Sequence, residues 1–360
     1  MIHDDAPVLL ARAGGTARIT LNRPRALNAL NPAMVAAVDQ ALTEWERDDG
    51  VTAVVLTGAG ERGLCAGGDI RMIHEEARTG GDGRATAAFW RAEYRLNARI
   101  ARYPKPYVAL MDGIVMGGGV GVSAHGDIRI VTERSAVAMP ETGIGLVPDV
   151  GGTHLLSRAP GELGTHLALT GRAVGAADAI LCGLADHFVP SARLPGLTAA
   201  LAGPEVRDAD AVREAVRRHA TEAPAGTLGE DRGWIDACYA ADSVEEIVER
   251  LLGSGRQPAR DTAGILATRS PTALKATLAA LRRSRGLATL EEALDQEYRS
   301  SCAALTFPDL VEGIRAQVID KDRAPRWSPK ELTEVTDADV ARFFARPPGG
   351  DLGLGGHASS

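Results

Sequence analysis

Buried strand-like runs that alternate with helix-like segments constrain this chain most strongly. The run VTAVVLTG (51–58) is continuously apolar, which predicts a strand buried on both faces. PYVALMDG (106–113) and DIRIVT (127–132) predict two more strands, and ARITL (17–21) predicts another that ends before an Asn and a Pro. Because helix-like segments separate these runs, the pattern is typical of an α/β fold.

Helix start signals are clear at three places. Asn31 and Pro32 open NPAMVAAVDQALTEW as N-cap and first helical residue, and its apolar residues recur at helical spacing. Ser243 opens SVEEIVERLL with a glutamate three residues later, as in a capping box. Ser270 precedes a proline at the start of SPTALKATLAALRR. Helical periodicity therefore dominates the second half of the chain.

The sequence divides into three parts. Residues 1–193 are predicted to form the α/β core that carries the binding site, and residues 194–345 a helical C-terminal region. Residues 346–360, within RPPGGDLGLGGHASS, have the Gly, Pro and Ser content of a disordered tail.

Charge, cysteine usage and hydropathy exclude several classes of protein. The 360-residue chain has a formal net charge of −7 and no run of Lys or Arg, which argues against a nucleic-acid surface. Its four cysteines lack zinc-ligand spacing and are interpreted as reduced thiols, with no metal site. No signal sequence or apolar run of membrane-spanning length is present, so we expect a soluble, cytoplasmic protein that does not bind membranes.

The segment AMPETGIGLVPDVGG carries two acids and no base. Glu141 and Asp149 stand there among small and apolar residues, in a stretch that otherwise resembles buried chain. Burying unpaired charge is costly, so these acids either face solvent on a surface loop or take part in chemistry.

Two glycine-rich loops follow predicted strands. GLCAGGDIR (63–71) and GIVMGGGVGVSAHG (113–126) place glycines where backbone N–H groups can approach a ligand without a Cβ in the way. Two such loops could direct two amides at one oxygen, an oxyanion hole worth about 3 to 4 kcal/mol per donor in acyl chemistry. Taken singly, each loop is better explained as a turn or as a place where a helix packs closely on a strand. Dinucleotide, P-loop and G-x-S-x-G motifs are absent from the sequence.

Four motifs in one order carry a family resemblance. ITLNRPRALNALN, GLCAGGDIR, MDGIVMGGGVG and MPETGIGLVPDVGG resemble the crotonase (enoyl-CoA hydratase/isomerase) superfamily, and most closely its 3-hydroxyisobutyryl-CoA hydrolase branch. The similarity continues through RAEYRLN, GLADHFVP, SPTALKATL, EYRSS and FPDLVEGIRAQVIDKDRAPRWSP, and so covers nearly the whole chain.

The resemblance implies a fold and a set of site residues. The fold is a spiral of repeated ββα units with a helical C-terminal part. The oxyanion donors are the amides of Gly68 and Gly118, and Glu93 lines the substrate pocket. The positions implied for coenzyme A are Arg25, Ala26, Leu27, Ala66 and Asp69. Arg25 would supply local positive charge in an acidic protein, although a solvated surface arginine explains it as well.

One departure from the hydratases points to hydrolysis. Family hydratases carry a second glutamate two residues after GGG, where this chain has Gly121, whereas Asp149 stands where hydratases usually have glycine. We therefore predict hydrolysis of a short 3-hydroxyacyl-CoA thioester by Glu141 and Asp149, which also contact substrate. Glu141 either attacks the thioester or activates water, and Asp149 acts as acid or base.

Two other functions remain open at this stage. One is enoyl-CoA hydration or isomerisation with Glu141 alone, and the other is a non-catalytic protein that binds CoA thioesters. No metal or redox cofactor is expected, since CoA is part of the substrate, and self-association is left open.

Overall fold

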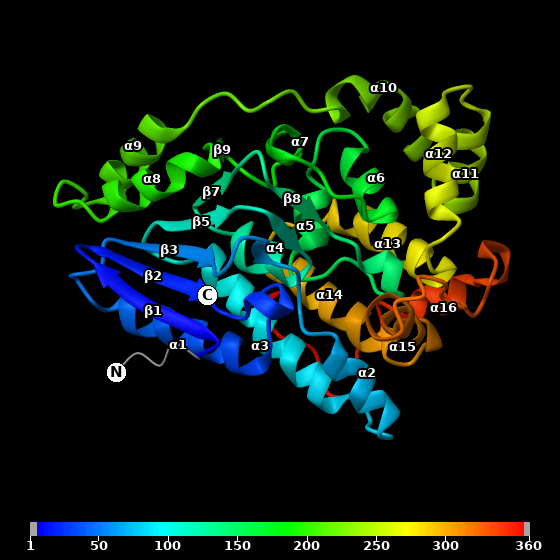
Figure 1. Ribbon diagram of the computed structural model, residues 1–360. Helices are drawn as coiled ribbons and strands as arrows, with labels where there is room; N and C mark the ends of the chain where they lie inside the picture. The colour runs from blue at the N-terminus through cyan, green and yellow to red at the C-terminus, as the bar shows by residue number, and fades with distance from the viewer. Residues whose placement is uncertain (1–5, 356–360) are drawn as a thin grey trace. The chain divides into compact units, whose positions relative to one another are not determined.

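The computed structural model describes residues 6–355 and has an α/β fold (Figure 1). Its strands are β1 (Val8–Ala13), β2 (Thr16–Leu21), β3 (Ala53–Gly58), β4 (Gly63–Cys65), β5 (Tyr107–Met111), β6 (Ile114–Met116), β7 (Ile128–Val131), β8 (Ala136–Ala138) and β9 (His187–Phe188). The strands predicted within 17–21, 51–58, 106–113 and 127–132 are confirmed as β2, β3, β5 and β7.

The helices of eight or more residues are α1 (Pro32–Glu46), α2 (Arg71–Arg78), α3 (Arg84–Ala101), α6 (Leu163–Thr170), α8 (Leu194–Leu201), α9 (Ala209–His219), α10 (Leu228–Tyr239), α11 (Val244–Gly253), α12 (Gln257–Leu266), α13 (Pro271–Ser284) and α14 (Leu290–Ala304). Shorter helical segments are η1 (Pro24–Ala26), α4 (Gly118–Ser123), η2 (Glu141–Ile144), α5 (Gly152–Leu156), α7 (Ala176–Leu181), η3 (Ser191–Arg193), α15 (Pro308–Ile314), η4 (Arg315–Ile319), η5 (Leu332–Glu334) and α16 (Asp337–Arg342).

The three predicted helix starts are confirmed. Asn31 Oδ1 accepts a hydrogen bond from Met34 N at 2.9 Å, and Pro32 is the first residue of α1. Ser243 caps α11 through Glu246 N at 3.2 Å, and Ser270 caps α13 in the same way. Each side chain satisfies an N–H group that the first turn of a helix leaves without a partner.

Two sheets receive alternate strands of the chain. The larger has the order β1-β2-β3-β5-β7-β9 and is parallel except for β1, while the smaller has the order β4-β6-β8. The chain goes from β3 to β4, from β5 to β6 and from β7 to β8, so each repeat contributes one strand to each sheet. This is the expected spiral of ββα units.

The chain forms two compact units, each built from separated segments. The first comprises residues 1–68, 95–137 and 174–226, and the second comprises 69–94, 138–173 and 227–360. The predicted boundary at residue 193 does not separate these units. The reason is that α8 and α9 cover one face of the large sheet, where Val55, Val108 and Ile130 pack against Leu197 and Val212 (Figure 1).

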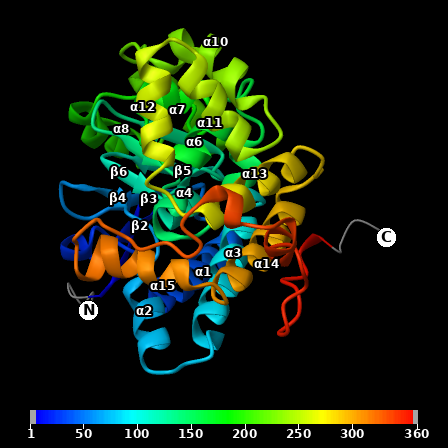
Figure 2. The ribbon, with the colours of Figure 1, turned by 90° about the vertical axis from the view of Figure 1, so that its right-hand side faces the viewer.

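The second unit is mainly helical. In it, α13 contacts α5, α6, α14 and α16, and the antiparallel pair α11 and α12 lies side by side (Figure 2). Its fully buried side chains include Leu251, Leu281 and Tyr239. The elements 138–173 and 69–94 bring the predicted acids into this helical unit.

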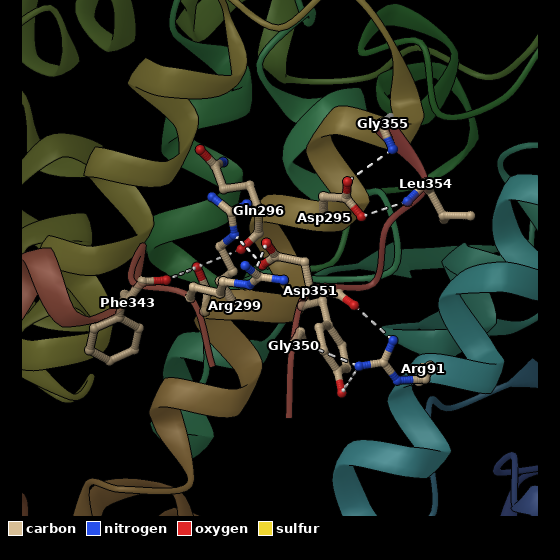
Figure 3. A network of polar contacts seen from close by, with 12 residues as sticks. Arg91, Asp295, Gln296, Arg299, Phe343, Gly350, Asp351, Leu354 and Gly355 are labelled. Atoms are coloured by element: carbon tan, nitrogen blue, oxygen red, sulfur yellow. Dashed lines mark hydrogen bonds and ion pairs between the residues drawn. The ribbon is translucent and has the colours of Figure 1, made fainter. Parts of the chain in front are cut away.

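The end of the described chain is ordered, which differs from the disordered tail predicted over 346–360. Arg91 donates to the carbonyl oxygens of Gly350 and Asp351 at 3.1 and 2.9 Å, and Arg299 pairs with Asp351 at 2.7 Å (Figure 3). Leu352 is 2% exposed. Composition favours disorder in this stretch, but specific polar partners and one buried leucine overcome it. Residues 356–360 lie outside the described residues.

Leu352→Ala tests this attachment. Removing a buried leucine side chain is expected to lower the free energy of unfolding by about 2 to 4 kcal/mol, as measured by denaturant unfolding. Leu252→Ala is the matched control because Leu252 is 57% exposed, so its replacement should change stability by less than about 0.5 kcal/mol. Equal stabilities of the two variants would show that the segment is free in solution.

Candidate active site

Glu141 and Asp149 are both buried within the second unit, so the surface-loop alternative is wrong. Glu141 opens η2 directly after Pro140 and is 4% exposed, while Asp149 lies in the extended segment after η2 and is 6% exposed. Among the described residues, Glu141 Oε2 has no hydrogen-bond partner. A buried carboxylate oxygen without a donor is costly, and it is available to a ligand or to water.

Asp149 is oriented by a tyrosine from α3. Tyr94 Oη donates to Asp149 Oδ2 at 2.6 Å, and Ser301 Oγ of α14 lies 2.7 Å from the same tyrosine oxygen. Tyr94 is fully buried and its ring packs edge-on against Tyr298 at 6.2 Å. One carboxylate of the pair therefore has a fixed direction, and the other keeps an oxygen without a partner.

Burial and mutual repulsion raise the pKa values of these acids. Burial is the largest cause for Glu141, whose pKa lies well above its usual range, and the charges of Asp149, Glu297 and Glu93 add to it. Burial also raises the pKa of Asp149 to about 6, against the opposing effect of the Tyr94 hydrogen bond. Nearby acids of this kind titrate as a pair, so the protonation of one carboxylate affects that of the other. Such a pair can supply both an acid and a base.

Glu93 joins the same cluster. It is 2% exposed, its Oε1 has no partner among the described residues, and burial together with the charge of Asp149 raises its pKa. Glu93 is therefore not an exposed helix acid, and the nearby Arg91 instead binds the C-terminal segment and stacks over the Tyr298 ring. The second unit thus brings Glu93, Glu141 and Asp149 together.

The two glycine loops lie together in the first unit. The first residues of these two segments form the short strands β4 and β6. Because these strands pair in parallel, the glycines that follow them lie at the same edge of the small sheet. A Cβ at Gly67 would lie 3.3 Å from Met116 O and 3.8 Å from Gly118 N, and a Cβ at Gly119 would lie 2.3 Å from Cys65 O. A side chain at Gly119 would therefore clash with the backbone.

Gly118 is well placed to donate through its backbone. It is the first residue of α4, after Gly117 at φ +48°, and the first N–H groups of a helix have no acceptor within the helix. Gly68 pairs with Leu30 in an isolated parallel bridge, next to Gly67 O, which accepts from Leu30 N at 2.8 Å. The first unit therefore holds both predicted donor residues at one edge of its small sheet.

Four of the five predicted coenzyme A positions also lie in the first unit. Arg25 and Ala26 are exposed residues of η1, Leu27 follows in the left-handed conformation, and Leu27 O accepts from Ala66 N at 3.0 Å. Asn28 fixes this turn, because its side chain bonds Arg23 N and the carbonyl oxygens of β4 and the loop before it. Asp69 belongs to the second unit.

Three residues near the acids were not predicted from the sequence. Tyr94 lies in RAEYRLN, and Glu297 and Ser301 lie in EYRSS, two motifs that the resemblance already included. Their roles depend on α3 and α14 meeting the segment around Asp149, which no local pattern reveals. The only available signal was that these polar motifs lie far from the four core motifs but resemble the same family.

Two kinds of feature are absent from the described part of the chain. Across residues 6–355, no group of three or more His, Cys, Asp or Glu side chains is arranged to hold a metal ion. Within the same range, no helix is long and apolar enough to cross a membrane.

Comparison with known proteins gives consistent matches over almost the whole chain. The family described as Enoyl-CoA hydratase/isomerase matches residues 16–344. The protein named 3-hydroxyisobutyryl-CoA hydrolase, mitochondrial, is 43% identical in Rattus norvegicus, covering 95% of this chain and 89% of that protein. Its Homo sapiens counterpart is 41% identical, covering 97% of this chain and 92% of the human protein.

Two solved structures share the fold closely. A crystal structure named carnitinyl-CoA dehydratase, from Mycobacterium thermoresistibile, is 52% identical, with a TM-score of 0.91 over 96% of this chain and 98% of that one. One named enoyl-CoA hydratase, from Rhodobacter sphaeroides 2.4.1, is 46% identical, with a TM-score of 0.87 and the same coverage.

Proposed function

The chain belongs to the enoyl-CoA hydratase/isomerase family, and on that premise we propose that it hydrolyses the thioester of a short 3-hydroxyacyl-CoA. The observation that carries this proposal is the buried pair Glu141 and Asp149, with Asp149 held by Tyr94, in a chain that has Gly121 at the hydratase position. The names of the curated vertebrate relatives support the same reaction.

In the proposed reaction, an oxygen replaces the thiol sulfur on the acyl carbon. Glu141 either takes a proton from water as the water oxygen attacks, or attacks itself to give a mixed anhydride that water then cleaves. Attack forms the C–O bond and moves negative charge onto the carbonyl oxygen. The C–S bond breaks when this tetrahedral intermediate collapses, and the leaving thiolate receives a proton that the acid pair holds. Glu141 suits the attacking role because its Oε2 has no partner, and Asp149 suits proton transfer.

The amides of Gly68 and Gly118 are proposed as donors to the thioester oxygen. Attack on the carbonyl carbon places negative charge on that oxygen, and backbone N–H groups stabilise the charge without having to reorganise. The support is the start of α4 at Gly118 and the close approach of the two glycine loops. Arg25, Ala26, Leu27, Ala66 and Asp69 remain the positions proposed for coenzyme A.

We propose 3-hydroxyisobutyryl-CoA of valine breakdown as the substrate, with 3-hydroxypropionyl-CoA next. The relatives' names support the first, and the free oxygen of Glu93 could accept the 3-hydroxyl group. The reaction needs water and the thioester, and no further cofactor is proposed. A cytoplasmic site and self-association remain predictions, since the curated relatives are named as mitochondrial.

Hydration of an enoyl-CoA is the second candidate. It is favoured by the two solved structures, which are named a dehydratase and a hydratase and are 52% and 46% identical to this chain. Gly121 weakens it, because a glycine cannot supply the second carboxylate that the hydratase reaction of this family uses. The two candidates differ in whether the C–S bond is broken.

A two-substrate assay separates the candidates. Purified protein is expected to release free thiol from 3-hydroxyisobutyryl-CoA, while the enoyl absorbance of crotonyl-CoA stays unchanged. Loss of enoyl absorbance without thiol release would overturn the proposed function in favour of hydration. Binding of both thioesters without turnover would indicate a non-catalytic binding protein.

A further inference from the structure

Glu297 of α14 is a fourth buried acid beside the proposed catalytic pair. It is 1% exposed, and its two carboxylate oxygens accept three hydrogen bonds. Gly151 N donates to Oε2 at 2.6 Å, while Thr153 N and Thr153 Oγ1 donate to Oε1 at 2.8 and 2.5 Å. All three donors come from the turn that directly follows Asp149, so the Glu297 side chain holds this turn at two residues, Gly151 and Thr153.

The turn over residues 149–153 is conformationally strained. Val150 has φ +52° and Gly151 has φ +83°, and Gly152 N donates to Asp149 O at 2.6 Å. The left-handed region is common for glycine but strongly disfavoured for a β-branched residue such as valine. Such a conformation persists only where the surroundings impose it, and strain of this kind concentrates at functional sites.

The turn fixes where the Asp149 carboxylate points. Asp149 lies immediately before the two positive-φ residues, so relaxation of Val150 toward ordinary backbone angles would rotate Asp149 relative to Tyr94. The 2.6 Å bond between Tyr94 Oη and Asp149 Oδ2 would then be lost. The Glu297 contacts oppose that relaxation from the other side of the turn.

Further contacts hold Glu297 and its partner in place. Ser284 Oγ of α13 donates to Thr153 Oγ1 at 3.0 Å, and Gln296 Nε2 donates to Ser284 Oγ at 3.0 Å. Among the groups on neighbouring elements, Glu93 of α3 and Glu297 act on Glu141, and Tyr94 of α3 acts on Asp149 through its hydrogen bond. Burial raises the pKa of Glu297 to about 8, so its hydrogen bonds to the turn, and not a fixed negative charge, are its contribution.

We propose that Glu297 is a positioning residue for thioester hydrolysis: through its hydrogen bonds to Gly151 and Thr153 it holds the strained turn 149–153 so that Asp149 faces the acyl group. This inference rests on the proposed function for its kinetic consequence. The hydrogen bonds by which Glu297 holds the turn do not depend on any substrate.

Glu297→Gln is the direct test. The glutamine keeps the shape, but its amide nitrogen faces an N–H donor of the turn, so one contact becomes repulsive. We expect kcat for thiol release to fall about 10- to 100-fold with KM within about twofold, because misplacement of a reacting group affects turnover more than binding.

Asp295→Asn is the matched control on the same helix. Asp295 accepts from the backbone N–H groups of Leu354 and Gly355 at 3.0 and 2.9 Å, so the substitution makes the same chemical change against a segment without a proposed catalytic residue (Figure 3). Its kcat is expected to stay within about twofold of the unmodified protein, with an unchanged pH profile. Equal losses of kcat in both variants would overturn the proposal, as would a folded Glu297→Gln protein with unchanged kcat.

Two further measurements keep the test decisive. If Glu297→Gln does not fold, the hydroxyl donor of Thr153 can be tested instead. Thr153→Val removes this donor and should lower kcat, whereas Thr153→Ser keeps the hydroxyl and should retain kcat. Equal kcat values for these two variants would overturn the proposal. Amide hydrogen exchange needs no substrate: Glu297→Gln should speed exchange of 149–156, and Asp295→Asn that of 350–355. If the unmodified protein releases no thiol, the proposed function fails. The exchange result still shows whether Glu297 holds the turn 149–153.

Discussion

The Glu141→Gln variant is expected to release thiol from 3-hydroxyisobutyryl-CoA about 10³-fold more slowly than the unmodified protein. An amide can neither attack the thioester nor take a proton from water at neutral pH. The fold should persist, because glutamine has nearly the same shape and Glu141 Oε2 has no hydrogen bond to lose among the described residues. The measurement is kcat and KM for thiol release, with KM expected to change little.

The same substitution is expected to leave stability equal or higher at pH 7 to 8. The pKa of Glu141 is raised from its ordinary value of 4.5 by burial and neighbouring acids, so the folded state binds this proton more tightly than the unfolded chain. Its stabilising contribution is fully present below pH 4.5 and is lost as the pH rises through the folded pKa. Glutamine has no such proton, so the variant should lose less stability over that range.

Glu230→Gln provides the control for the chemical change alone. Glu230 is an exposed residue in the first turn of α10 and has no role in the proposed reaction. Its replacement should leave both kcat and the unfolding temperature close to those of the unmodified protein. Thiol release by Glu141→Gln within about tenfold of the unmodified rate would remove Glu141 from the mechanism.

Asp149→Asn is expected to lower kcat about 100-fold or more and to abolish one limb of its pH profile. Burial raises the pKa of Asp149 to about 6, so its titration should appear as a limb near that pH. A limb in which the rate rises with pH would mean that the ionised form acts, and a limb in which it falls would mean that the protonated form acts. An unchanged limb in Asp149→Asn would assign that titration to another group.

Tyr94→Phe checks the same assignment without removing the acid. The Tyr94 hydroxyl donates to the Asp149 carboxylate and lowers its pKa against the effect of burial. Loss of this hydrogen bond should therefore move the Asp149 limb to higher pH, whichever form is active. A shift of the Asp149 limb to lower pH would show that the Tyr94 hydrogen bond does not control the pKa of Asp149.

Local sequence patterns predicted the elements whose stability is local. Asn31 and Ser270 bond to N–H groups three residues away, so their caps could be read directly from the chain. The run 51–58 is apolar throughout because β3 is covered on both faces, and its residue types alone indicated this. The shorter β4 and β6 were missed, because three residues carry too little periodicity to predict a strand.

The candidate site was predicted through resemblance more than through residue pattern. Glu141 and Asp149 stood out as acids in an apolar segment, but a solvated loop explained them as well until the burial of both was known. Tyr94 and Glu297 could not be assigned, since their contacts with residues 149–153 join segments separated by 55 and about 145 positions. Sequence patterns within one element contain no information about such distant partners.

The sequence by itself determined which segments form strands and helices, where glycines can expose backbone amides, and which acids stand in apolar surroundings. Only the tertiary structure decided that Glu93, Glu141, Asp149 and Glu297 share one buried cluster, that α8 and α9 cover the large sheet, and that residues 350–355 pack on α3 and α14. The physical reason is the sequence separation over which each kind of interaction acts. Caps and periodicity act over three or four residues, whereas burial and charge coupling depend on which distant segments meet.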